Sequence, residues 1–266
     1  MKVIVPVADK YQYLMPVFCE MFNKYWANQD CVILCFNLIS EKLPDNFEII
    51  SIGNDTQYWT SNLRRYFSTF KEEYFILHLE DFIIYDYVKI DRLNVMEEEM
   101  RSGADKAMLH SHLNVFADPL HDDVMLIRQD VEYRTSLHPA IWKTDYFMRF
   151  LQEDTSAWGF EITKKSINDG AKIVTMNSQN RYHDHIVDFM NLLRSGVVDT
   201  ALTGLPHEED LEILLKIPMT QENRDNLISR TNNICPVCKN RVDRMLISDR
   251  DVMRTYEKTG KCIHCQ

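Results

Sequence analysis

One short apolar segment constrains the fold of this chain more than any other. Residues 74–79 read Tyr-Phe-Ile-Leu-His-Leu, with almost no alternation of apolar and polar side chains. A run of this length, rich in aromatic and branched residues, is typical of a β-strand that is covered on both faces. The segment therefore predicts an interior strand in a layered α/β protein.

Two adjacent carboxylates, Glu80 and Asp81, end this strand. Open α/β sheets bind their ligands at the carboxyl ends of the strands, so the pair is a candidate for ligand binding. The alternative is that both side chains only terminate the strand and face solvent.

The segments on either side complete the α/β pattern. A strand, a helix with an apolar stripe and two further strands come first, and the strand–helix–strand order predicts parallel pairing through a right-handed crossover. These elements and the helix that precedes residue 74 are expected at residues 3–7, 13–26, 31–36, 47–52 and 58–70.

The pattern continues with alternating short strands and helices. Thr144 is predicted to be the N-cap of one of these helices. The expected helices are 91–100, 145–151 and a segment that follows residues 181–185 and runs through Arg194, and the expected strands are 107–110, 124–127, 136–142 and 172–176.

The loop 111–123 contains several side chains that could bind a metal. No spacing marks them as one site, so none is assigned. They are His112, Asp118, His121, Asp122 and Asp123.

Two sequence blocks carry a resemblance to a known family. The first is the order of elements that leads to Glu80-Asp81-Phe82, and the second is the strand, short helix and Trp158-Gly159-Phe160-Glu161 element near residue 160. Over roughly residues 1–195 the chain resembles the GT-A type glycosyltransferases of bacteria and phages. The resemblance implies a mostly parallel central sheet flanked by helices.

The resemblance also implies a nucleotide-sugar donor site at the carboxyl ends of the first, third and fourth strands. An arginine in that region could pair with the donor diphosphate, or could belong to a solvated helix face. The candidate donor-binding residues are Pro6, Val7, Ala8, Tyr11, Gly53, Asp55, Trp59, Arg65, Glu80 and Asp81.

In this family, an acceptor-side carboxylate acts as general base when the reaction inverts the anomeric centre. The resemblance assigns that role to Glu161, with Asp154 as second candidate. The alternative for Glu161 is a structural one, because a carboxylate in the first turn of a helix complements the helix dipole. Burial beside aromatic residues would raise its pKa and suit a base that works near neutrality.

A divalent cation such as manganese or magnesium is the cofactor that the resemblance implies. Asp81 would hold it, with a late histidine as further ligand. His183 and His185 lie two residues apart and are the candidates, although either could be an ordinary surface histidine.

The C-terminal segment carries a separate motif, two C-x2-C pairs separated by 23 residues. Four thiolates in two such pairs are typical of a tetrahedral structural zinc site, and they predict a small zinc-ribbon-like module. A redox-active pair is the alternative. The predicted zinc ligands are Cys235, Cys238, Cys262 and Cys265.

The sequence therefore predicts three parts, a catalytic domain over 1–196, a helical linker over 197–233 and a zinc module over 234–266. The formal net charge of −10 argues against a chain that coats nucleic acid along its whole surface. Residues 239–261, in contrast, hold seven basic and four acidic side chains. No apolar run is long enough to span a membrane, so a cytoplasmic protein is expected, in the host cytoplasm if it is phage-encoded.

Two functions from different classes fit these observations. The first is a glycosyltransferase that moves a hexosyl or pentosyl group from a nucleotide-sugar to an acceptor hydroxyl, on a glycan or on a hydroxymethylated DNA base. The second is a catalytically inactive protein of the same fold, whose zinc module docks onto nucleic acid or protein. Glu80 stands where the family motif D-x-D has its first aspartate, which keeps the second function open.

Overall fold

The computed structural model describes residues 1–37, 42–53, 58–152, 154–177, 185–194, 197–198 and 207–232. The predicted zinc module, with all four of its cysteines, lies outside these residues. So do two of the candidate site residues, Asp55 and His183.

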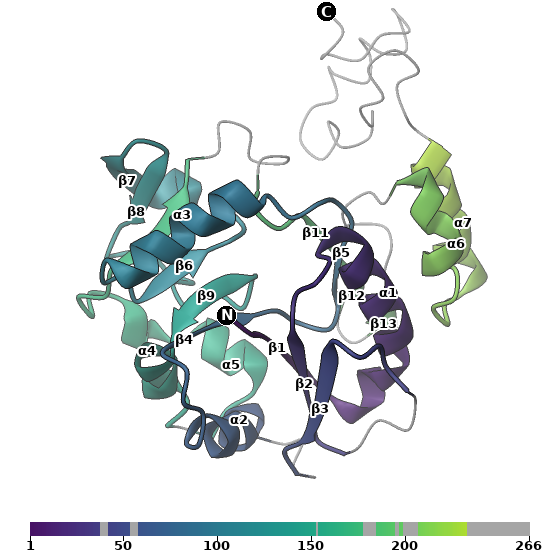
Figure 1. Cartoon of the computed structure of the whole chain (residues 1–266), viewed down its shortest axis with the longest axis horizontal. Coiled ribbons are helices and arrows are strands. Elements are labelled where there is room, and N and C mark those ends of the chain that lie inside the picture. The colour runs from purple at the N-terminus through teal and green to yellow at the C-terminus, as the bar shows by residue number, and fades with distance from the viewer. Residues whose placement is uncertain are drawn as a thin grey trace, which may run out of the picture.

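A nine-stranded sheet forms the centre of the molecule, in the order β3-β2-β1-β4-β9-β6-β10-β8-β7 (Figure 1). Strands β1 to β4 run parallel, and β9 is antiparallel to both β4 and β6. The strands are β1 Val3–Val7, β2 Cys31–Cys35, β3 Phe47–Ser51, β4 Tyr74–Leu77, β6 Lys106–Met108, β7 Ala117–His121, β8 Val124–Ile127, β9 Ala140–Lys143 and β10 Ile173–Met176.

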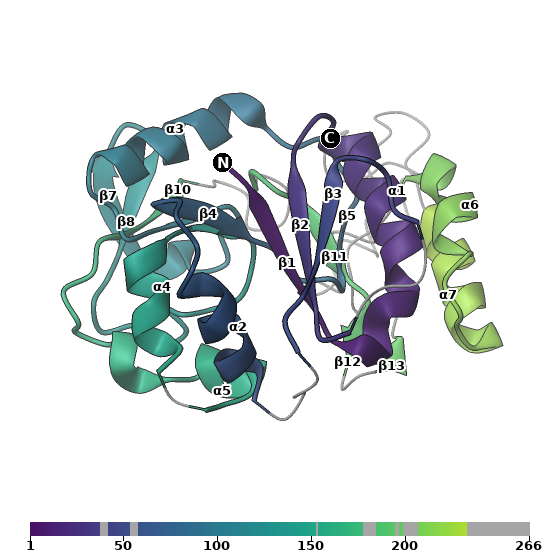
Figure 2. The ribbon, with the colours of Figure 1, turned by 60° about the horizontal axis from the view of Figure 1, so that its bottom comes forward.

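Helices cover both faces of the sheet (Figure 2). Strand β1 shows why, because all of its side chains are apolar and its alternate residues enter two different cores. Val3, Val5 and Val7 pack with residues of α1 and α3, whereas Ile4 packs with residues of α2, α4 and α5. These helices are α1 Met15–Tyr25, α2 Trp59–Phe67, α3 Ile90–Arg101, α4 Thr144–Phe150 and α5 Ala157–Glu161.

The α/β part of the predicted fold class is confirmed, since the chain has a mostly parallel central sheet between helices. The zinc module that the prediction added stays a prediction. The interior position of β4 agrees with its apolar sequence, because its side chains from Phe75 to Leu77 are buried. Within the described part of the chain, no helix combines the length and the apolar character needed to cross a membrane.

One predicted helix is wrong. Residues 185–194 form no helix; they run alongside residues 81–89 and hold β11 Phe189–Asn191, which pairs antiparallel with β5 Phe82–Ile84. A short hairpin of β12 Leu193–Arg194 and β13 Val197–Val198 follows. The apolar residues of this segment are buried by a non-local partner, which periodicity within the segment does not reveal.

Thr144 is not the N-cap of its helix. It is the first residue of α4, and its hydroxyl donates to the Glu72 carbonyl oxygen at 2.7 Å. The hydroxyl therefore fixes α4 to the segment before β4.

Two helices near the end of the described chain, α6 Leu211–Leu214 and α7 Gln221–Asn232, pack beside α1 (Figure 1). Asp210, fully buried, accepts a hydrogen bond from the Tyr25 hydroxyl at 2.6 Å and pairs with Lys24 at 2.6 Å. Leu214 and Leu227 join the core on the α1 side. This part of the predicted linker is thus attached to the sheet domain, whereas the three-part division itself stays a prediction.

Candidate functional site

The site is built at one edge of the sheet, where the parallel strands β1, β3 and β4 end. Because β9 is antiparallel, its first residue, Ala140, lies level with the last residues of β4 and β6, Leu77 and Met108. Segments that follow β4 and β6 therefore meet the segment that precedes β9. This one edge collects polar side chains from stretches of chain far apart in the sequence.

Glu80 and Asp81 lie at this edge and do not simply face solvent. Glu80 is only 8% exposed, and backbone N–H groups, including that of Ala8 at the end of β1, bind its carboxylate. Burial raises the pKa of Glu80, and the neighbouring Asp81 charge raises it further. Burial raises the pKa of Asp81 as well, and the Glu161 carboxylate adds to that rise.

No ion pair among the described residues neutralises these two carboxylates. The positive charge of Lys10 lowers the pKa of Glu80, but Lys10 forms no salt bridge with it. Two buried carboxylates without a basic partner form a place where a cation would relieve a large electrostatic cost. The residues present therefore fit a divalent cation.

The 3₁₀ helix Asp9–Leu14 follows β1 and lies beside the two carboxylates. Tyr13 shows the proximity, since burial raises its pKa and the charges of Tyr11, Asp81 and Glu80 raise it further. The Lys10 ammonium lies 4.6 Å from the centre of the Tyr11 ring. A basic and two phenolic side chains are thus available at the end of β1.

Gly53 and Arg65, two predicted donor-binding residues, are in contact. Gly53 follows β3 with a φ of +111°, a conformation that favours glycine. A methyl group placed on Gly53 would lie 2.7 Å from Nη1 of Arg65. Arg65 is exposed, and it also donates to the Asn62 side chain at 3.2 Å.

Glu161 is the last residue of α5, so its predicted position in the first turn of a helix is wrong. The helix dipole disfavours a carboxylate at this end, which removes the structural explanation based on the dipole. Instead, Oε1 of Glu161 accepts the Leu137 N–H at 2.7 Å. Burial raises the pKa of Glu161, as expected from the sequence, while the Leu137 N–H and Lys106 act in the opposite direction.

We refer to Glu80, Asp81 and Glu161 as the carboxylate cluster. Asp154 does not join it. The Asp154 carboxylate is exposed on the surface, where it accepts from the Ser61 hydroxyl at 2.6 Å and pairs with Arg64 at 3.0 Å. These two contacts, Ser61 first, lower its pKa.

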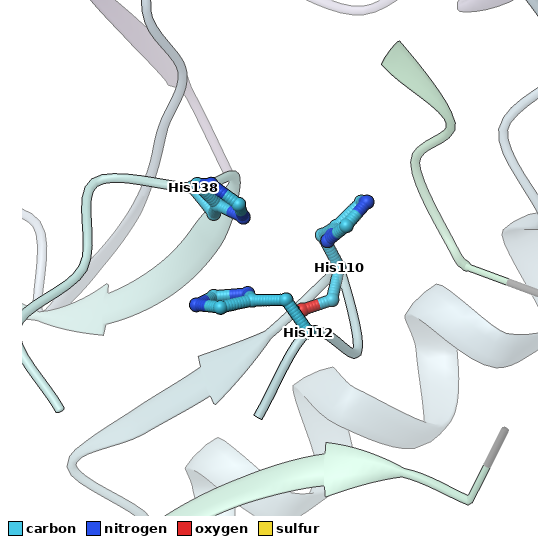
Figure 3. A group of neighbouring side chains, drawn as sticks. All are labelled: His110, His112 and His138. Carbon is cyan, nitrogen blue, oxygen red and sulfur yellow. The ribbon is translucent and has the colours of Figure 1, made fainter. Parts of the chain in front are cut away.

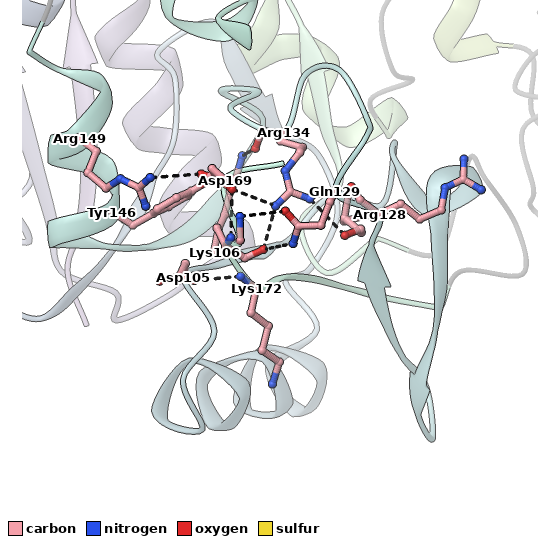
Figure 4. A network of polar contacts seen from close by, with 12 residues as sticks. Asp105, Lys106, Arg128, Gln129, Arg134, Tyr146, Arg149, Asp169 and Lys172 are labelled. Atoms are coloured by element: carbon pink, nitrogen blue, oxygen red, sulfur yellow. Dashed lines mark hydrogen bonds and ion pairs between the residues drawn. The ribbon is translucent and has the colours of Figure 1, made fainter. Parts of the chain in front are cut away.

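The segment that holds Leu137 is itself anchored by two fully buried basic residues (Figure 4). Lys106 Nζ donates to the carbonyl oxygens of Arg134 and Ser136 at 3.0 and 2.8 Å. The Arg134 guanidinium donates to the carbonyl oxygens of Ile127, Arg128 and Ala171 and pairs with Asp169 at 3.5 Å. Burial lowers the pKa of Lys106 well below its ordinary value. These bonds anchor Arg134 and Ser136 directly before Leu137, whose N–H binds Glu161.

Three histidines gather at the same edge of the sheet (Figure 3). His110 and His112 follow β6, and His138 precedes β9; we call them the histidine cluster. One ring nitrogen from each lies within 4.8 Å of the others. Burial lowers the pKa of all three, so that they are neutral at neutral pH. Neighbouring imidazole rings lower the pKa of His110 and His112 further, whereas Lys106 and His185 do so for His138.

His185, a predicted metal ligand, stacks on His110 with ring centres 3.6 Å apart. Its Nδ1 accepts the Ser111 N–H at 3.0 Å. Two aromatic rings, Phe82 and Phe189, stack at 4.2 Å and contact His138 at 5.5 and 5.3 Å. Phe82 follows Asp81 directly, so the histidine cluster borders the carboxylate cluster.

The remaining predicted donor-binding residues take mixed positions. Pro6 and Val7 are buried within β1, so only their backbone could reach a ligand, whereas Ala8 lies at the strand end. Tyr11 is half-buried in the 3₁₀ helix. The Trp59 ring packs edge-on against Phe160 at 5.5 Å, next to Glu161.

Several residues of this edge were not assigned from the sequence. Lys10 and Tyr13 lie in the helical turn that follows β1 directly. Their position just after a parallel strand could have identified them as candidate site residues. His110, His112 and His138 come from two segments that antiparallel pairing joins, and no local spacing identifies such a set. His112 alone was considered, together with loop residues that the structure does not bring to it.

Comparisons with known proteins give structural similarity only. No model of a protein family matches the chain, and no curated protein matches it. Among solved structures, S. aureus TarS 1-349 is 11% identical, with 97% of this chain and 77% of that chain covered and a TM-score of 0.44.

A UDP-glucose pyrophosphorylase complexed with UDP-glucose is 10% identical, with coverage of 71% and 92% and a TM-score of 0.45. The bifunctional IspDF from Campylobacter jejuni is 16% identical, with a TM-score of 0.41; the match covers 68% of this chain and about half, 50%, of the IspDF chain. These similarities concern the fold alone.

Proposed function

We propose that this protein is a transferase that uses a nucleotide-sugar donor, and more specifically a GT-A-like glycosyltransferase. One observation supports the proposal above all others. Three carboxylates, Glu80, Asp81 and Glu161, are buried or half-buried together at the carboxyl edge of a parallel sheet, and burial raises the pKa of each. Shifted carboxylates at a ligand-binding edge are typical of a catalytic site.

The donor would lie across the ends of β1, β3 and β4. The Arg65 guanidinium, above Gly53, offers a planar donor fork for a phosphate, and Lys10 offers a second positive charge. The Ala8 backbone and Tyr11 would border the nucleoside. Asp81 is the residue proposed to hold manganese or magnesium, which when bound would neutralise charge on the donor diphosphate.

Glu161 is proposed to act on the acceptor. Its carboxylate would take the proton from an acceptor hydroxyl while the hydroxyl oxygen forms a bond to the anomeric carbon. The bond from that carbon to the diphosphate oxygen would break, and the nucleoside diphosphate would leave with its electron pair. The Leu137 N–H at 2.7 Å orients the carboxylate for this task. Both a glycan and a hydroxymethylated DNA base offer such a hydroxyl.

The test is nucleoside diphosphate release from a panel of UDP- and GDP-sugars, with manganese, with magnesium and with chelator. We expect turnover of at least one donor, a dependence on divalent cation and a loss of turnover in Asp81→Asn. Asp118→Asn, which removes an exposed carboxylate on β7, is the matched control and should turn over normally. Donor binding without any turnover would contradict the proposal and favour an inactive binding protein.

A further inference from the structure

The ring nitrogens of the histidine cluster lie nearly as close together as the ligands of a single metal ion. Zinc–nitrogen bonds of about 2.1 Å place two tetrahedral ligand nitrogens roughly 3.4 Å apart. The three ring nitrogens of His110, His112 and His138 already lie within 4.8 Å of one another. In Figure 3, the three rings lie around one common space. Small rotations of the side chains would close the set on one ion.

The hydrogen bond that His112 makes leaves its other ring nitrogen unprotonated, as metal binding requires. Nδ1 of His112 lies 3.2 Å from the His110 carbonyl oxygen, so this nitrogen carries the proton and Nε2 keeps its lone pair. A backbone carbonyl on the other ring nitrogen is the usual support of a metal-binding histidine.

His110 and His138 supply the second observation. Nδ1 of each ring is buried and has no hydrogen-bond partner among the described residues. Buried polar atoms in folded proteins normally have a partner, so two such atoms in one cluster require an explanation. A bound metal ion would provide it.

The three ligands are held by rigid parts of the fold. The Leu109 N–H donates to the Pro139 carbonyl oxygen at 2.9 Å, and this bond joins the segments that carry His110 and His138. His185 stacks on His110 and binds the Ser111 N–H, so it would position the cluster and need not be a ligand.

We propose that His110, His112 and His138 bind one transition-metal ion of the zinc class, with a fourth position left open for water or a ligand oxygen. Imidazole donors suit zinc, copper and nickel, whereas magnesium and manganese prefer carboxylate oxygens. Three histidines with an open position are the ligand set of catalytic zinc sites. This site is separate from the cation proposed at Asp81, and it would exist whether or not the carboxylate cluster transfers a sugar.

The experiment measures zinc in the full-length chain and keeps the tail from interfering. Cys235→Ser and Cys238→Ser are introduced together, bound metal is removed with chelator, and zinc or cobalt is titrated in. We expect one zinc per chain in this background. Cobalt should show the visible absorption of a tetrahedral ion without the charge-transfer band that thiolate ligands produce.

Adding His110→Ala, His112→Ala or His138→Ala should each weaken zinc binding by at least ~100-fold, since loss of even a supporting group costs 10- to 100-fold. His121→Ala is the matched control, because His121 is a partly exposed histidine that pairs with Glu99 at 2.7 Å outside the cluster. It should leave zinc binding unchanged. A tenfold excess of magnesium should not displace the zinc.

His138→Gln guards against variants that fail to fold, because glutamine keeps most of the side-chain volume and its polarity. It should melt near the parent temperature without metal but lose the rise in melting temperature that zinc gives the parent. No zinc bound by the chain with Cys235→Ser and Cys238→Ser would overturn the proposal. Equal zinc binding by the histidine variants and their parent would overturn it as well.

Discussion

Replacing Glu161 by glutamine separates a catalytic role from a structural one, and the structure allows both effects to be estimated. Glutamine keeps an oxygen that can accept the Leu137 N–H now bound at 2.7 Å. Hydrogen bonds to charged groups contribute about 1.5–3 kcal/mol and neutral ones about 0.5–1.5, so the exchange costs roughly 1 kcal/mol. Removing a negative charge from the C-terminal end of α5 raises the free energy of unfolding by about 0.3–1 kcal/mol.

The free energy of unfolding of Glu161→Gln should therefore lie within about 1 kcal/mol of the parent, a shift of roughly 2–4 °C in melting temperature. Glutamine cannot accept a proton at neutral pH. If Glu161 is the general base, kcat for nucleotide release should fall by ~10² to 10⁴, with donor affinity little changed.

The pH dependence gives an independent reading of the same residue. Burial raises the pKa of Glu161, and only the ionised form can act as base. In the parent, kcat should decline as pH falls through a pKa above the ordinary glutamate value of about 4.3. That decline should be absent from the residual activity of Glu161→Gln.

Asp154→Asn is the control, because it removes the second candidate base from the surface pair with Arg64. It should keep near-normal kcat. Normal turnover by Glu161→Gln, or a large loss of turnover in Asp154→Asn alone, would refute the assignment of Glu161.

Three further predictions test other parts of the account. Glu80→Gln should raise the unfolding free energy by roughly 1–3 kcal/mol at neutral pH without metal, because the raised pKa of Glu80 means that its contribution to stability is lost as pH rises. Melts near pH ~3, below the ordinary glutamate pKa of about 4.3, should show little difference, because Glu80 is then protonated in both the folded and the unfolded state. Gly53→Ala should destabilise the chain by about 1–2 kcal/mol, because alanine is strained at a φ of +111°, and should weaken donor binding in calorimetry by displacing Arg65; an unchanged donor affinity would separate Arg65 from the donor site. Cys235→Ser should lower the zinc content measured by elemental analysis by one ion per chain while the main thermal transition stays in place, and an unchanged zinc content would remove the tail from the metal-binding residues.

The layered fold could be predicted because the patterns that indicate its strands and helices each lie within one short segment of sequence. An apolar run such as residues 74–79 is typical of an interior strand, and the apolar stripe on α1 indicates that one face of this helix packs on another layer. The helix wrongly predicted after His185 shows the limit of this reasoning. Phe189 to Asn191 are set as a strand by pairing with β5, a partner about a hundred residues away.

In the candidate site, too, local sequence signals predict some residues, and non-local strand pairing determines others. Glu80 and Asp81 could be predicted, because a strand end marks the ligand-binding edge of a parallel sheet. The helix position of Glu161 was wrong because α5 is only five residues long and ends on that glutamate. The histidine cluster could not be predicted, since it depends on β9 running antiparallel between β4 and β6.

The proposed donor site is tested most directly by a crystal structure. Crystals of the protein would be soaked with the nucleotide-sugar found active in the turnover assay, or with its nucleoside diphosphate and manganese. We expect density for the nucleotide across the ends of β1 and β3, with the diphosphate between Arg65 and Asp81. Its sugar end should point toward Glu161. A nucleotide bound elsewhere on the chain, with the carboxylate cluster untouched, would contradict the account.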